Sequence, residues 1–430
     1  MKKKVILILS ICFIFISSTF AANTEITIIY AGSANGILES CLCPGNLYGG
    51  YVNRLAVLDS LREIYPEAIV IDLGDFLPAM PDSLKSAYIL KAVAACRMDV
   101  IGVGDQDFIQ GVNFIVSSNL PLISMFCGKP GTLDAFFPAY KTFDREGIKI
   151  LFTSLLDPQL FDFYPDSIRK AIELPPPDEA WRKFTVLSEL KPDLTILISH
   201  MGYDRDLEFL KTHTDIDVLF SGHSQVLLPQ PEVHGKTIVA APGKNGEDVG
   251  VLHLNVPGSG EVVNFTHDLI PLKAEIVGES PVIRQLINEY DTDLREELKR
   301  KAIAGGRIFH GTAFCAECHR AEFESWQKTI HASAFDTLRN LGKSEMSNCI
   351  DCHTTGYGYP GGFESGESTP DMAGVGCEEC HRVPKSADFS SGKHNVLPVI
   401  EKWCTRCHLK PHIVSFDFEE MRKKIDHSGD

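Results

Sequence analysis

The segment Phe314-Cys315-Ala316-Glu317-Cys318-His319 introduces a short pattern that the chain repeats. The pattern is Cys-x-x-Cys-His, and it returns as Cys349-Ile-Asp-Cys352-His353, Cys377-Glu-Glu-Cys380-His381 and Cys404-Thr-Arg-Cys407-His408. Two cysteines at this spacing can form thioether bonds to the two vinyl groups of one porphyrin, and the histidine that follows can ligate its iron. The four copies therefore predict four covalently bound haem c groups.

A pair of zinc sites, each built from two Cys-x-x-Cys pairs, is the alternative interpretation of these cysteines. Zinc does not require a histidine after every second cysteine, whereas all four copies have one. With 13 cysteines and 15 histidines in 430 residues, random placement gives roughly 0.01 such pattern per chain. The pattern therefore favours haem over zinc.

Each haem iron needs a second axial ligand or keeps an open face. The pattern itself supplies the proximal ligands, namely His319, His353, His381 and His408. Four histidines close to the motifs are candidate distal ligands, namely His310, His331, His394 and His412. His427 lies in a charged tail and is the weakest candidate.

The amino-acid sequence around the motifs resembles the cytochrome c554 family. The matching segments, in order, are Phe314 to His319, Glu324-Ser-Trp326, His331-Ala-Ser-Ala-Phe335, Cys352-His353-Thr-Thr-Gly356, Gly362-Phe-Glu364, Ser368-Thr-Pro370 and Gly374 to His381. The resemblance implies a mostly helical tetrahaem electron carrier with closely stacked haems. It also implies that His331 ligates a haem other than its nearest one. Some relatives leave one iron five-coordinate, which would make that haem a reaction site.

Upstream, short apolar runs alternate with helical patterns, which indicates an α/β sheet covered by helices. The expected strands are Glu25–Ala31, Ala68–Asp72, Val100–Val103, Leu120–Met125, Leu194–Ser199, Val218–Phe220, Thr237–Ala241 and Val249–Asn255. The expected helices are Tyr51–Tyr65 and Ser83–Arg97. The last two strands come without a helix between them, which favours a mixed sheet or a sandwich.

The order of the loops in this region resembles the 5′-nucleotidase branch of the calcineurin-like metallophosphoesterases. The matching blocks are Ala31 to Gly36, Gly49-Gly50 with Arg54-Leu-Ala56, Asp72-Leu-Gly74-Asp75, Gly104-Asp-Gln-Asp-Phe108, Ser199-His200-Met-Gly202 and Ser221-Gly222-His223-Ser-Gln225. The resemblance implies an α/β sandwich whose loops hold two metal ions at the carboxyl ends of the strands. Such ions activate water for the hydrolysis of phosphate esters.

The metal-binding loops depart from that family pattern. Ser33 and Asn35 stand where the family has Asp and His, and Gln106 replaces the histidine that serves the transition state. A candidate vestigial site survives in four residues, namely Asp75, Asp105, His200 and His223, with Gln225 as a weak further ligand. These residues either hold one divalent ion or persist as polar loop anchors without metal.

The loop after Asn35 contains Cys41-Leu-Cys43-Pro44. A disulfide within such a short ring would be strained and easily reduced. Cys41 and Cys43, with Cys127 as a further member, are therefore a candidate redox pair or soft-metal site near His200 and His223. The alternative is a structural disulfide or inert thiols. Cys96, at the end of a helix, is expected to be a buried thiol.

Residues 1–21 have the features of a secretory signal. Lys2 to Lys4 form a basic end, and Val5–Phe20 is an apolar run of 16 residues. This run is shorter than the roughly 20 residues that a membrane-spanning helix requires. We expect cleavage, a periplasmic location and no membrane span afterwards, whereas an uncleaved signal would anchor the protein. Haem attachment outside the cytoplasm agrees with export.

Ser280-Pro281 and Gly305-Gly306 carry the signals that start and end a helix. Its expected apolar face contains Val282, Leu286, Tyr290 and Leu294. The expected organisation is thus a signal peptide (1–21), a degenerate phosphoesterase-like domain (22–275), a linker helix (276–306) and a tetrahaem cytochrome domain (307–430).

The net charge of −16 argues against a nucleic-acid partner, which requires a basic face. An acidic surface suits docking to redox partner proteins, such as other cytochromes or a membrane quinol oxidoreductase. The leading hypothesis is a periplasmic electron carrier that exchanges electrons with a redox or binding site on the N-terminal domain. One alternative is a metal-dependent phosphoesterase fused to a cytochrome. Another is a ligand- or partner-binding module that the fused cytochrome supplies with electrons.

Overall fold

The computed structural model describes residues 24–40, 48–187, 189–257, 262–305, 308–383, 389, 396–408 and 416–426. Several predicted features lie outside these ranges, namely the signal segment 1–21, Cys41, Cys43, His394, His412 and His427.

Two six-stranded mixed sheets form the N-terminal domain. The first contains, in spatial order, β12 (Asn264–Pro271), β11 (Asp248–Val256), β1 (Thr24–Ala31), β2 (Ile69–Asp72), β3 (Val100–Gly102) and β4 (Leu122–Ile123). The second contains β5 (Tyr140–Arg145), β6 (Ile148–Leu156), β7 (Leu194–His200), β8 (Val218–Ser221), β10 (Thr237–Ala240) and β9 (Glu232–His234). Strands β1 to β4 run parallel to one another, as do β6, β7, β8 and β10, whereas β11, β12, β5 and β9 pair antiparallel with their neighbours.

The helices and 3-10 turns of this domain are α1 (Tyr51–Ile64), α2 (Ser83–Ala95), η1 (Gln106–Phe108), α3 (Val112–Val116), η2 (Pro158–Phe163), α4 (Asp166–Arg169), α5 (Pro177–Leu187), α6 (Tyr203–Leu210) and α7 (Ala274–Val277). The helices and 3-10 turns that follow this domain in the chain are α8 (Pro281–Gly305), α9 (Thr312–Ala316), α10 (Arg320–Trp326), α11 (Ala334–Asn340), α12 (Ser347–His353), η3 (Pro370–Met372), α13 (Cys377–Cys380), α14 (Glu401–Cys404) and α15 (Phe418–Ile425).

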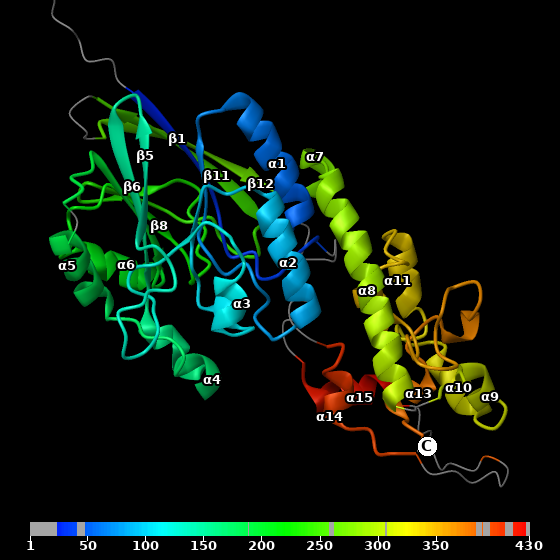
Figure 1. The fold of residues 1–430 in the computed structure, drawn as a ribbon. Coiled ribbons are helices and arrows are strands. Elements are labelled where there is room, and N and C mark those ends of the chain that lie inside the picture. Colours follow the sequence, from blue (N-terminus) through cyan, green and yellow to red (C-terminus); the bar gives the residue numbers. More distant parts are fainter. Residues whose placement is uncertain are drawn as a thin grey trace, which may run out of the picture.

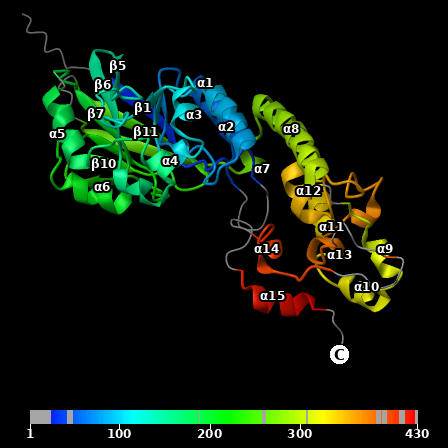
Figure 2. The ribbon, with the colours of Figure 1, turned by 60° about the horizontal axis from the view of Figure 1, so that its bottom comes forward.

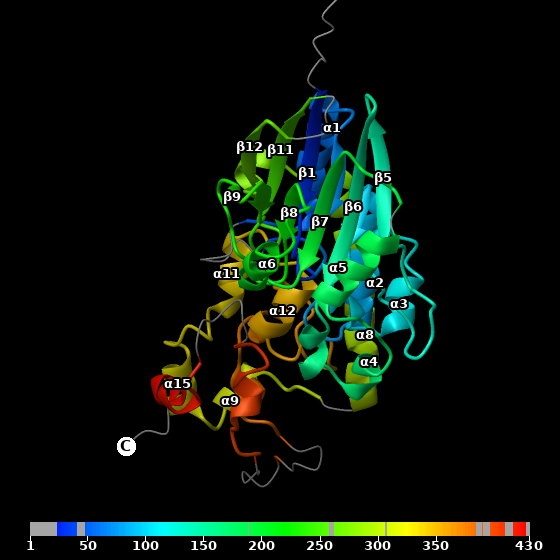
Figure 3. The same ribbon diagram turned by 90° about the vertical axis from the view of Figure 1, so that its left-hand side faces the viewer.

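The sheets pack face to face, with helices on both outer surfaces (Figures 1 and 3). Along β1, Ile26, Ile28 and Tyr30 point into the core between the sheets, whereas Ile29 and Ala31 join the core beneath α1, α2 and α8. This alternation follows from the two-residue period of a strand. A third core lies beneath α5 and α6 on the far side. The predicted α/β sandwich is confirmed.

The predicted strands are present, with two differences. The segment Leu120–Met125 contributes only a two-residue strand, β4. The β5–β6 hairpin and strands β9 and β12 were not predicted. Tyr140–Arg145 is mostly exposed, so its side chains lack the apolar alternation that would have marked a half-buried strand.

Helix α8 is shared between the two halves of the chain (Figures 1 and 2). Its first half packs on α1 and α2, where Ile283, Ile287 and Tyr290 are buried. Its second half reaches the C-terminal region, where Leu298 packs on a separate small core and α12 lies against the helix. The predicted apolar face is wrong at Val282, which is 53% exposed.

The C-terminal region consists of short helices joined by irregular segments (Figure 2). Most of these helices have four to eight residues, and the motif cysteines lie on or next to α9, α12, α13 and α14. The charged tail forms α15 over Phe418–Ile425. Within the described residues, no helix combines the length and apolar content needed to cross a membrane.

Candidate functional site

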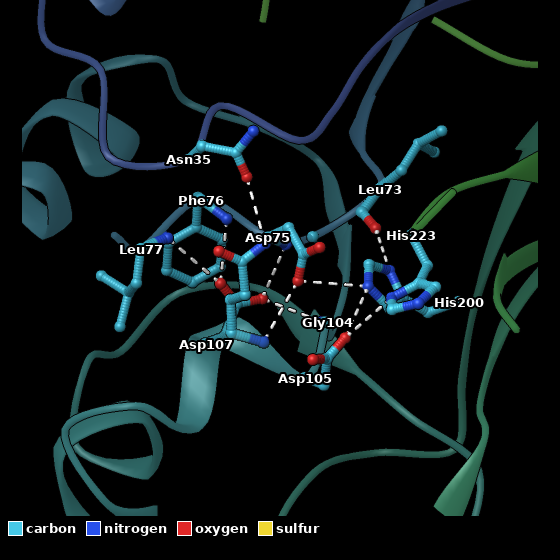
Figure 4. A network of polar contacts seen from close by, with 12 residues as sticks. Asn35, Leu73, Asp75, Phe76, Leu77, Gly104, Asp105, Asp107, His200 and His223 are labelled. Carbon is cyan, nitrogen blue, oxygen red and sulfur yellow. Dashed lines mark hydrogen bonds and ion pairs between the residues drawn. The ribbon is translucent and has the colours of Figure 1, made fainter. Parts of the chain in front are cut away.

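Four polar side chains converge at the carboxyl ends of strands from both sheets (Figure 4). Asp75 follows β2, Asp105 follows β3, His200 ends β7 and His223 follows β8. One ligand atom from each lies within 4.8 Å of all the others. His200 Nε2 lies 3.1 Å from Asp75 Oδ1 and 3.3 Å from Asp105 Oδ1, and His223 Nδ1 lies 3.1 Å from Asp105 Oδ1. The structure therefore brings together the four residues predicted as a vestigial site.

The donor set fits one divalent cation. Asp75, Asp105 and His200 are buried, and Asp75 Oδ2 has no hydrogen-bond partner among the described residues. Burial lowers the pKa of His200, but the Asp75 charge and hydrogen bonds to Asp105 and Asp75 outweigh it and raise the pKa well above its usual range. Burial raises the pKa of Asp105, but hydrogen bonds from His200 and His223 lower it below its usual range. A cation would replace the proton that compensates these carboxylates.

Asp107 holds the loops of the site in place. Its carboxylate accepts hydrogen bonds from the backbone N–H groups of Asp75, Phe76, Leu77 and Gly104. This residue is fully buried, so these bonds satisfy donors that water cannot reach. Asp107 lies in the Gly104–Phe108 block of the family resemblance, but the resemblance assigned no role to it. Its position two residues after Asp105 was the available signal.

The residues that replace the lost ligands form a polar chain of their own. Gln106 Nε2 donates to Asn35 Oδ1 at 3.1 Å, and Asn35 Nδ2 donates to Asn245 Oδ1 at 3.0 Å. Ser33 and Asn35 have positive φ angles of 44° and 50°. Such strained backbone is typical of ligand-bearing loops. The loop thus keeps a strained conformation, while the Asn35 side chain binds Gln106 and Asn245 from two other segments of the chain.

Asp206, on α6, is fully buried and accepts hydrogen bonds from the hydroxyl groups of Ser199 and Ser221. Burial raises the pKa of this carboxyl from 3.8 to about 7. A raised pKa means that the folded chain holds the proton more tightly than the unfolded chain. The stability contributed by protonated Asp206 is therefore complete below pH 3.8 and is lost as the pH rises through about 7.

We predict that Asp206→Asn weakens this pH dependence. In denaturant titrations with a chelator present, the free energy of unfolding of the parent should fall, relative to the variant, as the pH rises from about 4 to about 7. The parent-minus-variant difference isolates this carboxyl from the others. A difference that stays constant over this range would contradict the assignment.

Cys96 and Cys127 are both fully buried. The prediction of a buried thiol at Cys96 is confirmed. Cys127 packs in the core that also contains Phe137 and Phe161, and burial raises the pKa of its thiol to about 12. Metal ligation and redox exchange require a thiolate, which this environment disfavours near neutral pH. The structure thus argues against Cys127 as a member of a soft-metal site.

The four Cys-x-x-Cys-His motifs lie in a row within the C-terminal region. The Cys315 thiol is within hydrogen-bonding reach of Cys377, which places motif one beside motif three. Helix α13 of motif three packs on α14 of motif four. The Cys407 thiol of motif four is in turn within hydrogen-bonding reach of Cys352 of motif two. The spatial order is therefore one, three, four, two.

Charged residues at the variable motif positions join neighbouring motifs. Glu378 accepts hydrogen bonds from the backbone N–H groups of His310 and Gly311, just before motif one. Arg406 of motif four pairs with Glu379 of motif three at 3.1 Å and with Asp351 of motif two at 3.6 Å. Residues between the cysteines of motifs two, three and four thus connect neighbouring motifs.

The histidines and cysteines of this region fit haem c. All eight motif cysteines are free thiols. His353 Nδ1 lies 2.8 Å from the Ala334 carbonyl oxygen, so this nitrogen donates and Nε2 is left to ligate an iron. The rings of His331 and His408 lie 6.0 Å apart. Metal–imidazole bonds of about 2 Å place two rings on opposite sides of one iron at roughly this separation.

The candidate distal ligands differ in their surroundings. His331 faces His408 of motif four, which is not its nearest motif in sequence. His310 is exposed and lies 5.2 Å from the Phe314 ring beside motif one. The structure therefore pairs one of the two described candidates with a proximal histidine. Of the remaining proximal candidates, His381 follows α13 directly, and His319 lies between α9 and α10, immediately before Arg320.

Residues 314–382 match the model of the family described as cytochrome c554 and c-prime. Cytochrome c-554 of Nitrosomonas europaea is 32% identical over 143 residues, which cover 25% of this chain and 61% of that protein. The C-terminal region resembles cytochrome c554. This resemblance implies covalently bound haem c, in agreement with the four motifs.

The N-terminal domain resembles a different group of proteins. A 5′-nucleotidase of Vibrio vulnificus is 26% identical over 333 residues, covering 65% of this chain and 59% of that protein. The solved structure of the sulfate thiohydrolase SoxB from Thermus thermophilus has a TM-score of 0.56 and 15% identity, covering 67% of this chain and 62% of the other. The chain thus spans about three fifths of the length of the cytochrome and of the nucleotidase that it matches.

Proposed function

We propose that this protein is a periplasmic tetrahaem c-type cytochrome that transfers electrons, and that its N-terminal domain offers a binding or redox site rather than a hydrolytic centre. The order of the four motifs is the observation that carries the proposal. Each motif lies next to another, so four haems attached there would form one continuous series. Haem supplies one-electron chemistry when bound. The chain's own part is to position the haems and set their potentials.

The N-terminal site supports a single ion. Asp75, Asp105, His200 and His223 converge on one point. A two-metal hydrolase needs a second set of ligands about 3.5–4 Å from the first ion. Ser33 and Asn35 lack the carboxylate and imidazole of such a set, and the Asn35 side chain is engaged by Gln106 and Asn245.

The route and the partners of the electrons belong to the same proposal. The N-terminal domain would exchange electrons through Cys41 and Cys43 or through a ligand bound at its ion site. The partners would be other cytochromes or a membrane quinol oxidoreductase, docking on the acidic surface. The metal-dependent phosphoesterase remains the competing function, because the N-terminal domain resembles 5′-nucleotidases.

We predict negligible hydrolysis of phosphate esters. The purified holoprotein, supplied with manganese, zinc or cobalt, should turn over p-nitrophenyl phosphate and AMP at well below about 1 s⁻¹, an ordinary enzyme rate. The missing ligand set for a second ion at Ser33 and Asn35, and the replacement of the transition-state histidine by Gln106, are the reasons. The matched control is Asp75→Ala, which removes an ion ligand. A turnover above that rate in the parent, abolished in Asp75→Ala, would establish the hydrolase instead.

A further inference from the structure

A buried carboxylate of the N-terminal domain is held by cations from two other parts of the chain. The side chain of Glu39 is 5% exposed. It lies 2.7 Å from the Arg284 guanidinium on α8 and 3.0 Å from the Lys343 ammonium in the C-terminal region. Lys343 also donates to the Ser40 carbonyl oxygen at 3.4 Å. These contacts join the loop that follows β1 to the segment that precedes motif two.

Motif two is the motif that adjoins this cluster. Its helix, α12, begins four residues after Lys343 and packs on α8. The Ser347 hydroxyl donates to the Asp291 carbonyl oxygen of α8 at 3.1 Å. The charges of Lys343, Asp291 and Glu39 all act on the Cys349 sulfur. The acidic contacts that the described residues make around motifs one, three and four come instead from the C-terminal region, where Glu378 accepts hydrogen bonds from the backbone just before motif one and Glu379 pairs with Arg406.

We propose that the haem attached at Cys349 and Cys352 is the one that faces the N-terminal domain, and that the charges of Glu39 and Lys343 set its reduction potential. This inference rests on the proposed electron-transfer function. Cys352 of motif two lies beside Cys407 of motif four, and the backbone N–H of Gly356, three residues after motif two, donates to Glu379 of motif three at 2.8 Å. The N-terminal domain adjoins motif two through Glu39 and α8.

The two charges act on this haem with opposite signs. Reduction adds an electron, so a buried negative charge disfavours the reduced iron and a positive charge favours it. Glu39→Gln should therefore raise the potential of one haem, and Lys343→Gln should lower it. One partly buried charge changes such an equilibrium by about tenfold, which is about 59 mV for a one-electron couple. The double variant should return close to the parental potential.

The test is a spectroelectrochemical titration of the purified holoprotein with electron paramagnetic resonance at each potential. The expected result is a shift of one couple, upward in Glu39→Gln and downward in Lys343→Gln, with three couples unchanged. Glu279→Gln is the matched control, because Glu279 also pairs with Arg284, at 2.9 Å, but its side chain is 47% exposed. We expect this control to leave all four couples in place.

Removal of the second haem assigns the shifted couple. In a Cys349→Ala/Cys352→Ala chain, the Glu39→Gln shift should disappear. If this chain does not fold, the inference is still tested by two results: opposite shifts in potential in Glu39→Gln and Lys343→Gln, and no shift in Glu279→Gln. Shifts of the same sign, an equal shift in Glu279→Gln, or no shift in a protein with four reversible couples would overturn it. Fewer than four haems, or no reversible couples, would instead overturn the proposed function.

Discussion

A chain produced without haem attachment is expected to lose the folded structure of its C-terminal region and to keep that of the N-terminal domain. The described C-terminal core is small, and its buried apolar residues are Phe309, Phe335, Leu338, Ile350, Tyr357, Phe363 and Met372. Helices α13 and α14 have four residues each, far below the roughly 12 at which an isolated helix becomes even marginally stable. Small domains of this kind need stabilisation beyond their apolar core, and covalently bound haem would supply it.

Limited proteolysis of the apo and holo chains measures this effect. Peptides from 308–408 should appear early in the apo chain and late in the holoprotein, while peptides from 48–257 serve as the internal control and stay protected in both. The holoprotein should retain its haem in acid acetone, and pyridine haemochrome should report about four haems per chain. A cooperative, protease-resistant C-terminal region in the apo chain would contradict the expectation, as would zinc in place of a Soret band.

Arg54→Ala is expected to destabilise the N-terminal domain by about 3–5 kcal/mol. Arg54 and Asp72 form an ion pair at 2.8 Å, and both side chains are 1% exposed. Arg54 also donates to the Gly32 carbonyl oxygen at 3.2 Å, between β1 and α1. Removal of the guanidinium leaves a buried carboxylate with no compensating charge, which costs far more than the loss of the pair's net attraction.

Arg62→Ala is the matched control for this substitution. Arg62 lies on the same helix, pairs with Asp59 at 3.2 Å and donates to the carbonyl oxygens of Cys96 and Arg97, but its side chain is 22% exposed and that of Asp59 is 48% exposed. Such pairs contribute about 0–1 kcal/mol. Denaturant unfolding of both variants, followed by circular dichroism in the holoprotein, gives the comparison. Equal losses in the two variants would show that Arg54 acts through packing rather than through its charge.

The sequence predicted those features that depend on local pattern. The sandwich followed from short apolar runs, and the haem motifs followed from a fixed spacing. Helix α8 was predicted to within one residue at its end, but its buried stripe includes Ile283 and Ile287 rather than Val282. Two adjacent apolar residues can each begin a helical stripe, and the domain that the helix packs on decides between them.

The site could be predicted as a set of residues but not as a geometry. Asp105 and Asp107 have the same side chain two residues apart, yet one faces the ligand cluster and the other binds four backbone N–H groups. The resemblance implied that His331 ligates a haem other than its nearest one, but only the tertiary fold identifies His408 as the histidine that its ring faces. The contact of Glu39 with Lys343 spans 304 residues and leaves no sequence pattern.

The 25 residues of α8 amount to a rod about 37 Å long, at 1.5 Å per residue. Because its two halves are embedded in different cores, the distance between the ion site and the second motif is set at folding and not by diffusion. Under the proposed function, electron exchange between the N-terminal domain and the second motif should therefore depend on driving force and on a fixed separation, without a docking step. Added glycerol would slow a reaction limited by the diffusional docking of two mobile domains. It should leave the rate of electron transfer between the N-terminal domain and the second motif unchanged.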